Sequence, residues 1–208
     1  MTDDAAATGA ETAAGSGART GKGAPRKRAD ARRNERALLD AAAAVFVTSG
    51  VEAPVREIAS RAGVGVATIY RHFPTRADLI AAVYRHQVEA CAEAGESLLA
   101  GGGSPYDALG RWVNRFVDFV ATKHGLAAVL QSDDPAFQAL HTYFIDRLVP
   151  VCDGLLRAAA DAGEIRGDID AYELMRGIGN LCIGAESDPR YDARRLVGLL
   201  VAGLRRTP

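Results

Sequence analysis

Cysteine, tryptophan and long apolar runs are all scarce in this sequence of 208 residues. The three cysteines, Cys91, Cys152 and Cys182, are odd in number and form no CxxC pair, so neither a disulfide framework nor a zinc site is indicated. No apolar run approaches the length of a membrane span, and the N-terminus lacks the apolar core of a signal peptide. These absences predict a cytoplasmic protein with no metal site and no membrane partner.

Recognisable catalytic motifs are missing as well. The four histidines, at positions 72, 86, 124 and 141, form no HExxH or comparable ligand spacing, and no phosphate-binding loop or nucleophile motif is visible. No stretch alternates apolar and polar residues in the way a half-buried strand does. The sequence therefore predicts an all-α protein that is not an enzyme and requires no cofactor.

Charge is plentiful but unevenly distributed along the chain. Residues 19–85 carry 13 Lys and Arg residues against six Asp and Glu residues, whereas residues 86–208 carry 12 against 17. This asymmetry predicts that the front of the chain faces a polyanion and the rear does not. The basic stretch RKRADARRNER, residues 26–36, fits either a solvated leader or an arm or helix start that lies along phosphates.

Helix signals divide most of the chain into about nine helices. Residues 1–28 are predicted to be a disordered tail with a basic end, because residues 1–24 offer almost no large apolar side chain to offset the entropy of ordering. A first helical domain is expected over residues 29–74 and a second over residues 75–208. In the second, amphipathic segments are expected to begin at Ser104-Pro105, Asp134-Pro135, Asp170 with Glu173, and Asp188-Pro189.

Two short predicted helices, residues 55–62 and about 65–72, have the form of a helix-turn-helix. Ala59 is small enough for the second helix to approach, and Gly63 supplies the positive φ of the turn. With Ile69 facing inward, Ala67, Thr68, Tyr70 and Arg71 face outward. Such units also serve as plain packing corners, but the basic surroundings favour DNA binding, with a thin face in the major groove and donors at the helix end on phosphates.

The stretches ALLDAAAAVFVTSG and VREIASRAGVGVATIYRHFPTRADLIAAV, within residues 33–85, resemble the TetR family of bacterial regulators. The resemblance implies an N-terminal three-helix DNA-binding unit, joined through a long helix to a helical domain for effector binding and dimerisation. By motif position, Arg56 and residues 66–68 would face base edges, and Tyr70, His72 and Arg76 would hold the DNA backbone. The predicted DNA-binding residues are Arg56, Gly65, Val66, Ala67, Thr68, Tyr70, Arg71, His72 and Arg76.

Several positions depart from the family pattern. Pro54 and Val55 stand where hydroxyl side chains are usual, and Gly65 stands where a serine cap is common. Val66 and Ala67 can contact thymine methyl groups but offer no side-chain hydrogen bonds. Arg56 is then the candidate for a bidentate contact to guanine, which is worth about 1–3 kcal/mol of discrimination, and further specificity is expected from DNA shape.

The rear of the chain holds apolar and aromatic stripes that we expect to be mostly core. The segment WVNRFVDFVATKHGLAAVL nevertheless resembles the SbtR-like C-terminal domains of the family, which implies an effector pocket between these helices. His141 lies within one stripe, as either a hydrogen-bonded core histidine or a polar anchor in a pocket. The predicted effector-pocket residues are Trp112, Phe116, Val120, His141, Phe144, Leu148, Ile178 and Cys182.

The last predicted helix carries apolar residues over roughly 200° of its surface, which is wider than one domain face requires. The family resemblance implies that the last two helices form a four-helix bundle between two subunits. The predicted dimer-interface residues are Leu174, Ile178, Leu181, Leu196, Leu199, Leu200, Gly203 and Leu204. Twofold symmetry of such a dimer predicts a palindromic operator.

The function predicted from the sequence is that of a homodimeric repressor, which a small-molecule effector releases from a palindromic operator in double-stranded DNA. One alternative is a constitutive or architectural DNA-binding protein without effector control. A helical enzyme is the other, and the missing motifs argue against it. The effector, the operator and the choice between repressor and activator stay open.

Overall fold

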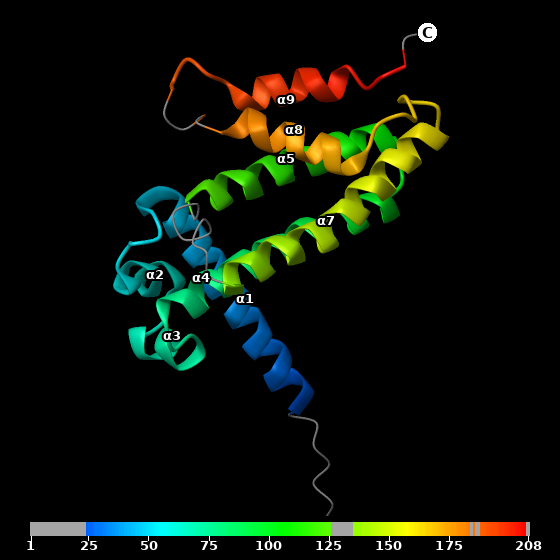
Figure 1. Cartoon of the computed structure of the whole chain (residues 1–208). Coiled ribbons are helices and arrows are strands. Elements are labelled where there is room, and N and C mark those ends of the chain that lie inside the picture. The colour runs from blue at the N-terminus through cyan, green and yellow to red at the C-terminus, as the bar shows by residue number, and fades with distance from the viewer. Residues whose placement is uncertain (1–23, 126–134, 184, 186–187, 207–208) are drawn as a thin grey trace, which may run out of the picture.

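The computed structural model describes residues 24–125, 135–183, 185 and 188–206, and these ranges form an all-helical protein (Figure 1). The described helices are α1 (Ala24–Ser49), α2 (Val55–Ala62), α3 (Val66–His72), α4 (Arg76–Ala100), α5 (Pro105–Gly125), α7 (Pro135–Asp161), α8 (Ala171–Cys182) and α9 (Ala193–Ala202). Within these ranges the only β-type pairing is an isolated bridge between Ile165 and Arg205. The predicted all-α class is confirmed. The sequence predicts about nine helices, and residues 126–134, between α5 and α7, lie outside the described part.

Helices α1, α2 and α3 gather at one end of the molecule, and α4 leads from there into the rest of the bundle (Figure 1). Helix α4 packs against both α5 and α7, while α8 packs against α5 and α7 and α9 packs against α5 and α8. Among the described residues, no helix has an apolar stretch long enough to span a bilayer. The long α4 continues the chain from the three N-terminal helices into the rear bundle, and α1 adds a second connection by packing against α5.

Local hydrogen bonds explain why α2 ends at Ala62 and α4 begins at Arg76. Gly63 ends α2 with a φ of 67°, and its neighbour Val64 donates its backbone N–H to the Ala59 carbonyl at 3.0 Å, which is the Schellman arrangement. Helix α4 begins with a capping box, in which the Asp78 N–H donates to the Thr75 hydroxyl and the Thr75 N–H donates to the Asp78 carboxylate. The turn at Gly63 lies where the sequence predicts it.

Two helix starts differ from the predicted ones. Helix α1 begins at Ala24, so the basic stretch 26–36 is helical and the predicted tail of residues 1–28 overlaps the start of α1. Helix α9 begins at Ala193, where the Asp192 side chain accepts from the Arg195 N–H at 3.0 Å. Asp188 instead accepts from the Arg190 N–H at 3.0 Å in the preceding turn. Short acidic side chains accept hydrogen bonds in turns as readily as at the starts of helices. This explains why the predicted start of α9 is four to five residues too early.

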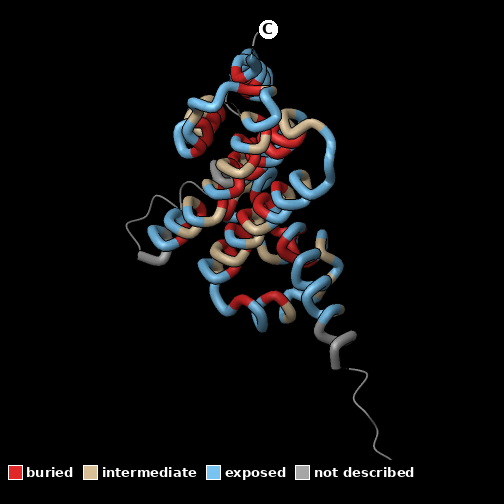
Figure 2. Tube along the Cα trace, turned by 90° about the vertical axis from the view of Figure 1, so that its right-hand side faces the viewer, coloured by how far each residue is buried: buried red, intermediate tan, exposed pale blue. Residues whose placement is uncertain are grey.

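A single apolar core runs from the N-terminal helices into the rear bundle, as the buried positions in Figure 2 indicate. Phe46, Ile58 and Ile69 are fully buried at the front, and Leu109 and Leu155 are fully buried at the rear. The predicted division between residues 74 and 75 falls between α3 and α4, but the core crosses it. A change in packing at the rear can therefore reach the N-terminal helices through α4, which packs against α1, and from α1 through α2 to α3.

Candidate DNA-binding surface and ligand cavity

One side of helix α3 packs against the core, and the opposite side is exposed to solvent. Ile69 is 1% exposed and Phe73 is buried, whereas Tyr70 is 50% exposed and Val66 is 38% exposed. The same outer side carries Ala67, which is also exposed. Ile69 faces inward and Ala67, Tyr70 and Arg71 are exposed, as helical periodicity predicts, whereas Thr68, which was also predicted to face outward, is half-buried. The result is a narrow, protruding helix face of the size that enters a DNA groove.

Exposed basic side chains are also present on helices α1 and α2. Arg56 is exposed on α2, and Arg71 and His72 line a shallow hollow between α3 and α1 together with the half-buried Thr68. Helix α1 adds the exposed Arg32 to the positive surface. The exposed cations at this end of the molecule suit the phosphates of a duplex.

The predicted phosphate contact Arg76 lies differently from the other cations. Its guanidinium group donates a 2.7 Å hydrogen bond to the backbone carbonyl of Ala53, and its Nε is buried with no hydrogen-bond partner among the described residues. In this position Arg76 fastens the start of α4 to the connection between α1 and α2. A phosphate contact by Arg76 stays a prediction, and it would require the side chain to turn outward.

A cavity of about 190 Å³ lies between α5, α7 and α8. Four of the eight predicted pocket residues line it, and they are Phe116, Val120, His141 and Phe144. Seven further residues line the cavity without having been predicted, and they are Ile145, Tyr172, Met175, Arg176, Gly179, Asn180 and Ile183. Six of these belong to α8 or its end, where the spacing of 172, 176, 180 and of 175, 179, 183 is the signal that could have found them.

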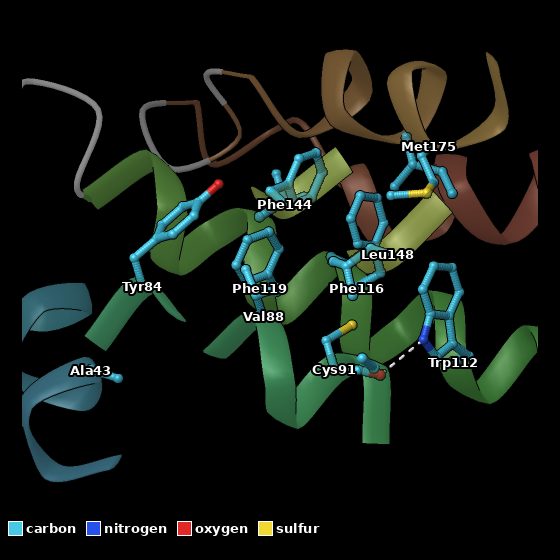
Figure 3. Packing of buried hydrophobic residues seen from close by; sticks show 14 of the residues in the cluster. Ala43, Tyr84, Val88, Cys91, Trp112, Phe116, Phe119, Phe144, Leu148 and Met175 are labelled. Carbon is cyan, nitrogen blue, oxygen red and sulfur yellow. Dashed lines mark hydrogen bonds between the residues drawn. The ribbon is translucent and has the colours of Figure 1, made fainter. Parts of the chain in front are cut away.

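The other four predicted pocket residues are core residues that do not border the cavity. Trp112 is fully buried, and its indole N–H donates a 3.0 Å hydrogen bond to the Cys91 carbonyl of α4 (Figure 3). Leu148, Ile178 and Cys182 are also buried outside the lining. Helical periodicity separates inner from outer positions, but it does not tell which inner side chains meet an unfilled space.

Stacked aromatic rings line one side of the cavity, and Figure 3 shows two of them, Phe116 and Phe144. The Phe144 ring lies 6.2 Å from the Phe116 ring at 16° and 5.9 Å from the His141 ring at 24°. His141 is exposed, which excludes the core alternative and agrees with a polar residue in a pocket. The nearly parallel rings create a flat apolar surface, with His141 at its solvent side.

The predicted dimer-interface residues separate into two groups. Leu174, Ile178 and Leu204 are buried within the subunit, so their assignment to an interface is wrong in this arrangement. The others reach the surface to some extent, and they are Leu181, Leu196, Leu199, Leu200 and Gly203. Leu199, on α9, is 61% exposed. Exposed leucines therefore form an apolar surface on α9, but fewer of the predicted residues are exposed than the sequence suggested.

A polar network ties the outer side of α7 to α4. The Arg147 Nε donates to both carboxylate oxygens of Glu89, at 3.1 and 3.2 Å, and another Arg147 nitrogen donates to Glu96 at 3.0 Å. The Tyr143 hydroxyl also donates to Glu89. Burial by itself raises the pKa of Glu89, but the hydrogen bonds from Tyr143 and Arg147 outweigh burial and bring the pKa below its ordinary value of 4.5.

Replacing Glu89 by glutamine should therefore have a pH-dependent effect on stability. A carboxylate whose pKa is lowered by folding stabilises the native state above its unfolded pKa, and that stability is lost as the pH falls through the folded pKa. After allowance for solvent screening at this half-exposed site, we expect E89Q to lose roughly 0.5–1 kcal/mol at pH 7. Thermal melts from pH 3 to 7 should show the difference from wild type closing below about pH 4.5.

Glu93→Gln is the matched control, because Glu93 also lies on α4 but pairs only with Arg36, at 3.4 Å and with both side chains more than half exposed. It should change the melting temperature less than E89Q does. A loss in E89Q that stays constant or grows on acidification would contradict the assigned role of Glu89.

Two family models match the chain in consecutive regions. The model of the bacterial regulatory proteins of the tetR family matches residues 38–83, which span the end of α1 through the start of α4. The model of the C-terminal domain of SbtR-like transcriptional regulators matches residues 104–206, which include α5 and α7–α9. The two matches coincide with the helix-turn-helix end and with the part of the chain that holds the cavity.

Similar proteins are also described as transcriptional regulators. The crystal structure of a TetR transcriptional regulator from Streptomyces coelicolor is 35% identical, with a TM-score of 0.72, over 84% of this chain and 99% of that chain. The HTH-type transcriptional repressor KstR from Mycolicibacterium smegmatis is 32% identical over 85 residues, 40% of this chain and 42% of KstR. The transcriptional regulator FadR from Bacillus subtilis, solved in complex with stearoyl-CoA, shares the fold with a TM-score of 0.57 at 21% identity, over 81% of this chain and 96% of that one.

Proposed function

Because the chain belongs to the TetR family of bacterial transcriptional regulators, we propose that it is a homodimeric repressor, released from a palindromic operator when a small molecule enters the cavity. The observation that carries the proposal is the exposed side of α3, together with the exposed Arg56 on α2, in a chain that also holds a partly apolar cavity between α5, α7 and α8. The three N-terminal helices are suited to DNA, and the cavity is suited to a ligand. KstR, the similar repressor, supports the repressor role.

Contacts with the operator would divide between the two helices of the helix-turn-helix. The outer face of α3, with Val66, Ala67 and Tyr70, would enter the major groove and contact thymine methyl groups and the backbone. Arg56 at the start of α2 would supply the base-specific hydrogen bonds. Arg71 and His72 would contact phosphates, which fix the position of the helix without reading sequence.

Dimerisation would use the exposed apolar side of α9. Leu196, Leu199 and Leu200 are all exposed on this ten-residue helix, and leucine side chains that cluster on one helix are stabilised by burial against a like surface. A twofold axis through this surface would pair the two α3 helices on one side of the DNA. The half-sites would then lie one helical turn apart, or a multiple of it.

Release would depend on the path from the cavity to α3. Ligand contacts with His141, Phe144 and Ile145 would shift α7, and the Glu89 network on the other side of α7 would carry the shift to α4. Only three residues separate α3 from α4, so a small tilt of α4 changes the spacing of the two recognition helices. The ligand must favour one spacing over the other for this coupling to work. The FadR structure with stearoyl-CoA supports a ligand role for this fold.

Selecting genomic fragments with the purified protein tests the function directly. The bound fragments should share two half-sites related by twofold symmetry, with centres about 34–36 Å or a multiple of that apart. The operator so defined should bind at least about a thousand times more tightly than random DNA at physiological salt. Equal binding of random and selected fragments at that salt would instead favour an architectural DNA-binding protein.

Leu199→Asp provides the internal control for the dimer. Since Leu199 is 61% exposed in the subunit, the substitution should leave the fold intact while placing a charge in the dimer interface. We expect the operator affinity to fall about tenfold at low protein concentration, because each half-site is then bound alone. Leu99→Asp, at an exposed position near the end of α4, should leave both the oligomeric state and the affinity unchanged.

A further inference from the structure

The volume of the cavity fits a small molecule. At about 190 Å³ it is somewhat larger than an engineered apolar cavity of about 150 Å³ that binds benzene. It is smaller than the roughly 300–1,000 Å³ of pockets for drug-sized ligands. The space therefore suits one six-membered ring with a small substituent.

The apolar part of the lining favours a flat ligand. Phe116 and Phe144 present nearly parallel rings, 6.2 Å apart at 16°, and Val120 and Ile145 add aliphatic surface. Opposite them, α8 contributes Met175, whose thioether makes favourable contacts with aromatic rings. A planar ring would bury both of its faces against such walls, which a branched aliphatic ligand of equal volume would do less well.

Helix α8 presents two parallel stripes to the cavity. Met175, Gly179 and Ile183 recur every four residues and form an apolar stripe, and Tyr172, Arg176 and Asn180 recur at the same interval and form a polar stripe. Gly179 contributes to the free space, because a Cβ built there would have no neighbouring heavy atom within 4 Å. One helix thus supplies both a slot for a ring and a polar border.

The charge on the polar border is positive. Arg176 is exposed and makes a 3.4 Å hydrogen bond to the Tyr172 hydroxyl. Among the described lining residues there is no Asp or Glu, and no described carboxylate forms an ion pair with Arg176. A guanidinium group binds a carboxylate through two parallel hydrogen bonds, and the tyrosine hydroxyl can donate a third.

From this combination we propose that the effector is a monocyclic aromatic carboxylate. Its ring lies in the slot between the phenylalanine wall and Met175, and its carboxylate binds Arg176 and the Tyr172 hydroxyl. This inference rests on the proposed effector role of the cavity and adds the chemical class of the ligand. A small quaternary ammonium would stack on the same rings, but it would be repelled by Arg176.

Isothermal titration of the full-length protein with three ligands of similar shape tests the proposal. Benzoate should bind more tightly than neutral benzamide, by about tenfold, because the charge-assisted hydrogen bonds are lost in the amide. Phenyltrimethylammonium should bind more weakly still. Equal affinity for benzoate and benzamide, or a preference for the cation, would overturn the proposal.

Two variants connect the binding to the assigned residues. Arg176→Gln should reduce benzoate affinity about tenfold and leave benzamide affinity within about twofold, because only the carboxylate uses the guanidinium. Gly179→Leu should fill the cavity and remove the binding of both compounds without a loss of melting temperature, since the site has open space and leucine favours a helix more than glycine does. Arg157→Gln, on an exposed α7 site paired with Asp153, is the matched control and should bind both as wild type does. Normal benzoate binding by folded R176Q or G179L would contradict the assignment.

Measuring operator affinity with and without benzoate separates this inference from the proposed function. Selective benzoate binding without a change in operator affinity would support the ligand class and refute release by an effector. Tight operator binding with no uptake of any ring compound would refute the ligand class and leave the DNA-binding role. Failure to bind any genomic DNA would refute the proposed function itself, whatever the titration shows.

Discussion

Replacing Arg56 by alanine should weaken operator binding by roughly 30- to 20,000-fold. One bidentate contact between arginine and guanine is worth about 1–3 kcal/mol, and a symmetric dimer makes it twice. Arg56 is exposed at the start of α2, and no other described part of the chain binds its guanidinium group, so it is available to DNA. Fluorescence anisotropy with the selected operator and with random DNA, at fixed salt, measures the effect.

The loss in R56A should fall mainly on the operator, because a base contact carries sequence information and a phosphate contact does not. Operator variants at the contacted base pair should then be bound by R56A about as well as the operator itself. Arg61→Ala on the same helix is the matched control, and we expect it to change affinity for operator and random DNA by similar factors. An R56A protein that keeps its full preference for the operator would refute the assignment.

Replacing Gly95 by alanine should destabilise the protein by about 2–4 kcal/mol, although alanine favours a helix more than glycine does. A Cβ at Gly95 would collide with Val151 of α7 and would lie 2.9 Å from Cδ1 of Trp112. The indole cannot simply move away, because its N–H donates to the Cys91 carbonyl one turn earlier on α4. Chemical denaturation should show the loss, and the melting temperature should fall by about 4–16 °C.

Gly110→Ala serves as the control for this substitution. Gly110 lies within α5, and a Cβ at Gly110 would meet no heavy atom within 4 Å. The change should therefore stabilise the protein by up to about 1 kcal/mol through helix propensity alone. If G95A were as stable as wild type, α4, α5 and α7 could not be packed as closely as they are here.

Much of the DNA-binding end could be predicted from the sequence, because its determinants are local. Gly63 ends α2 and Thr75 with Asp78 begins α4 through hydrogen bonds that span three to five residues. The inward position of Ile69 follows from helical periodicity within α3. Arg76 is the exception. Its hydrogen bond to Ala53 joins residues 23 positions apart, which no local pattern encodes.

The cavity and the exposed surface of the proposed dimer were predicted less completely, for a related reason. Ile178 was assigned both to the pocket and to the interface, and it is fully buried between helices instead. Tyr172 and Arg176 were missed because polar residues on an amphipathic helix are expected to face solvent. Only the placement of α8 beside α5 and α7 turns that polar stripe into the border of a cavity.

The sequence by itself determined the helical class, the helix-turn-helix with its Gly63 turn, and the outward side of α3, since each of these depends on neighbours within about one or two helical turns. The tertiary structure alone decided where the packed helices leave an unfilled space, which leucines of α9 stay exposed and why Gly95 admits no side chain. Those features depend on distances between helices that are far apart in the chain. Such distances are set by the packing of the whole core and not by any one segment.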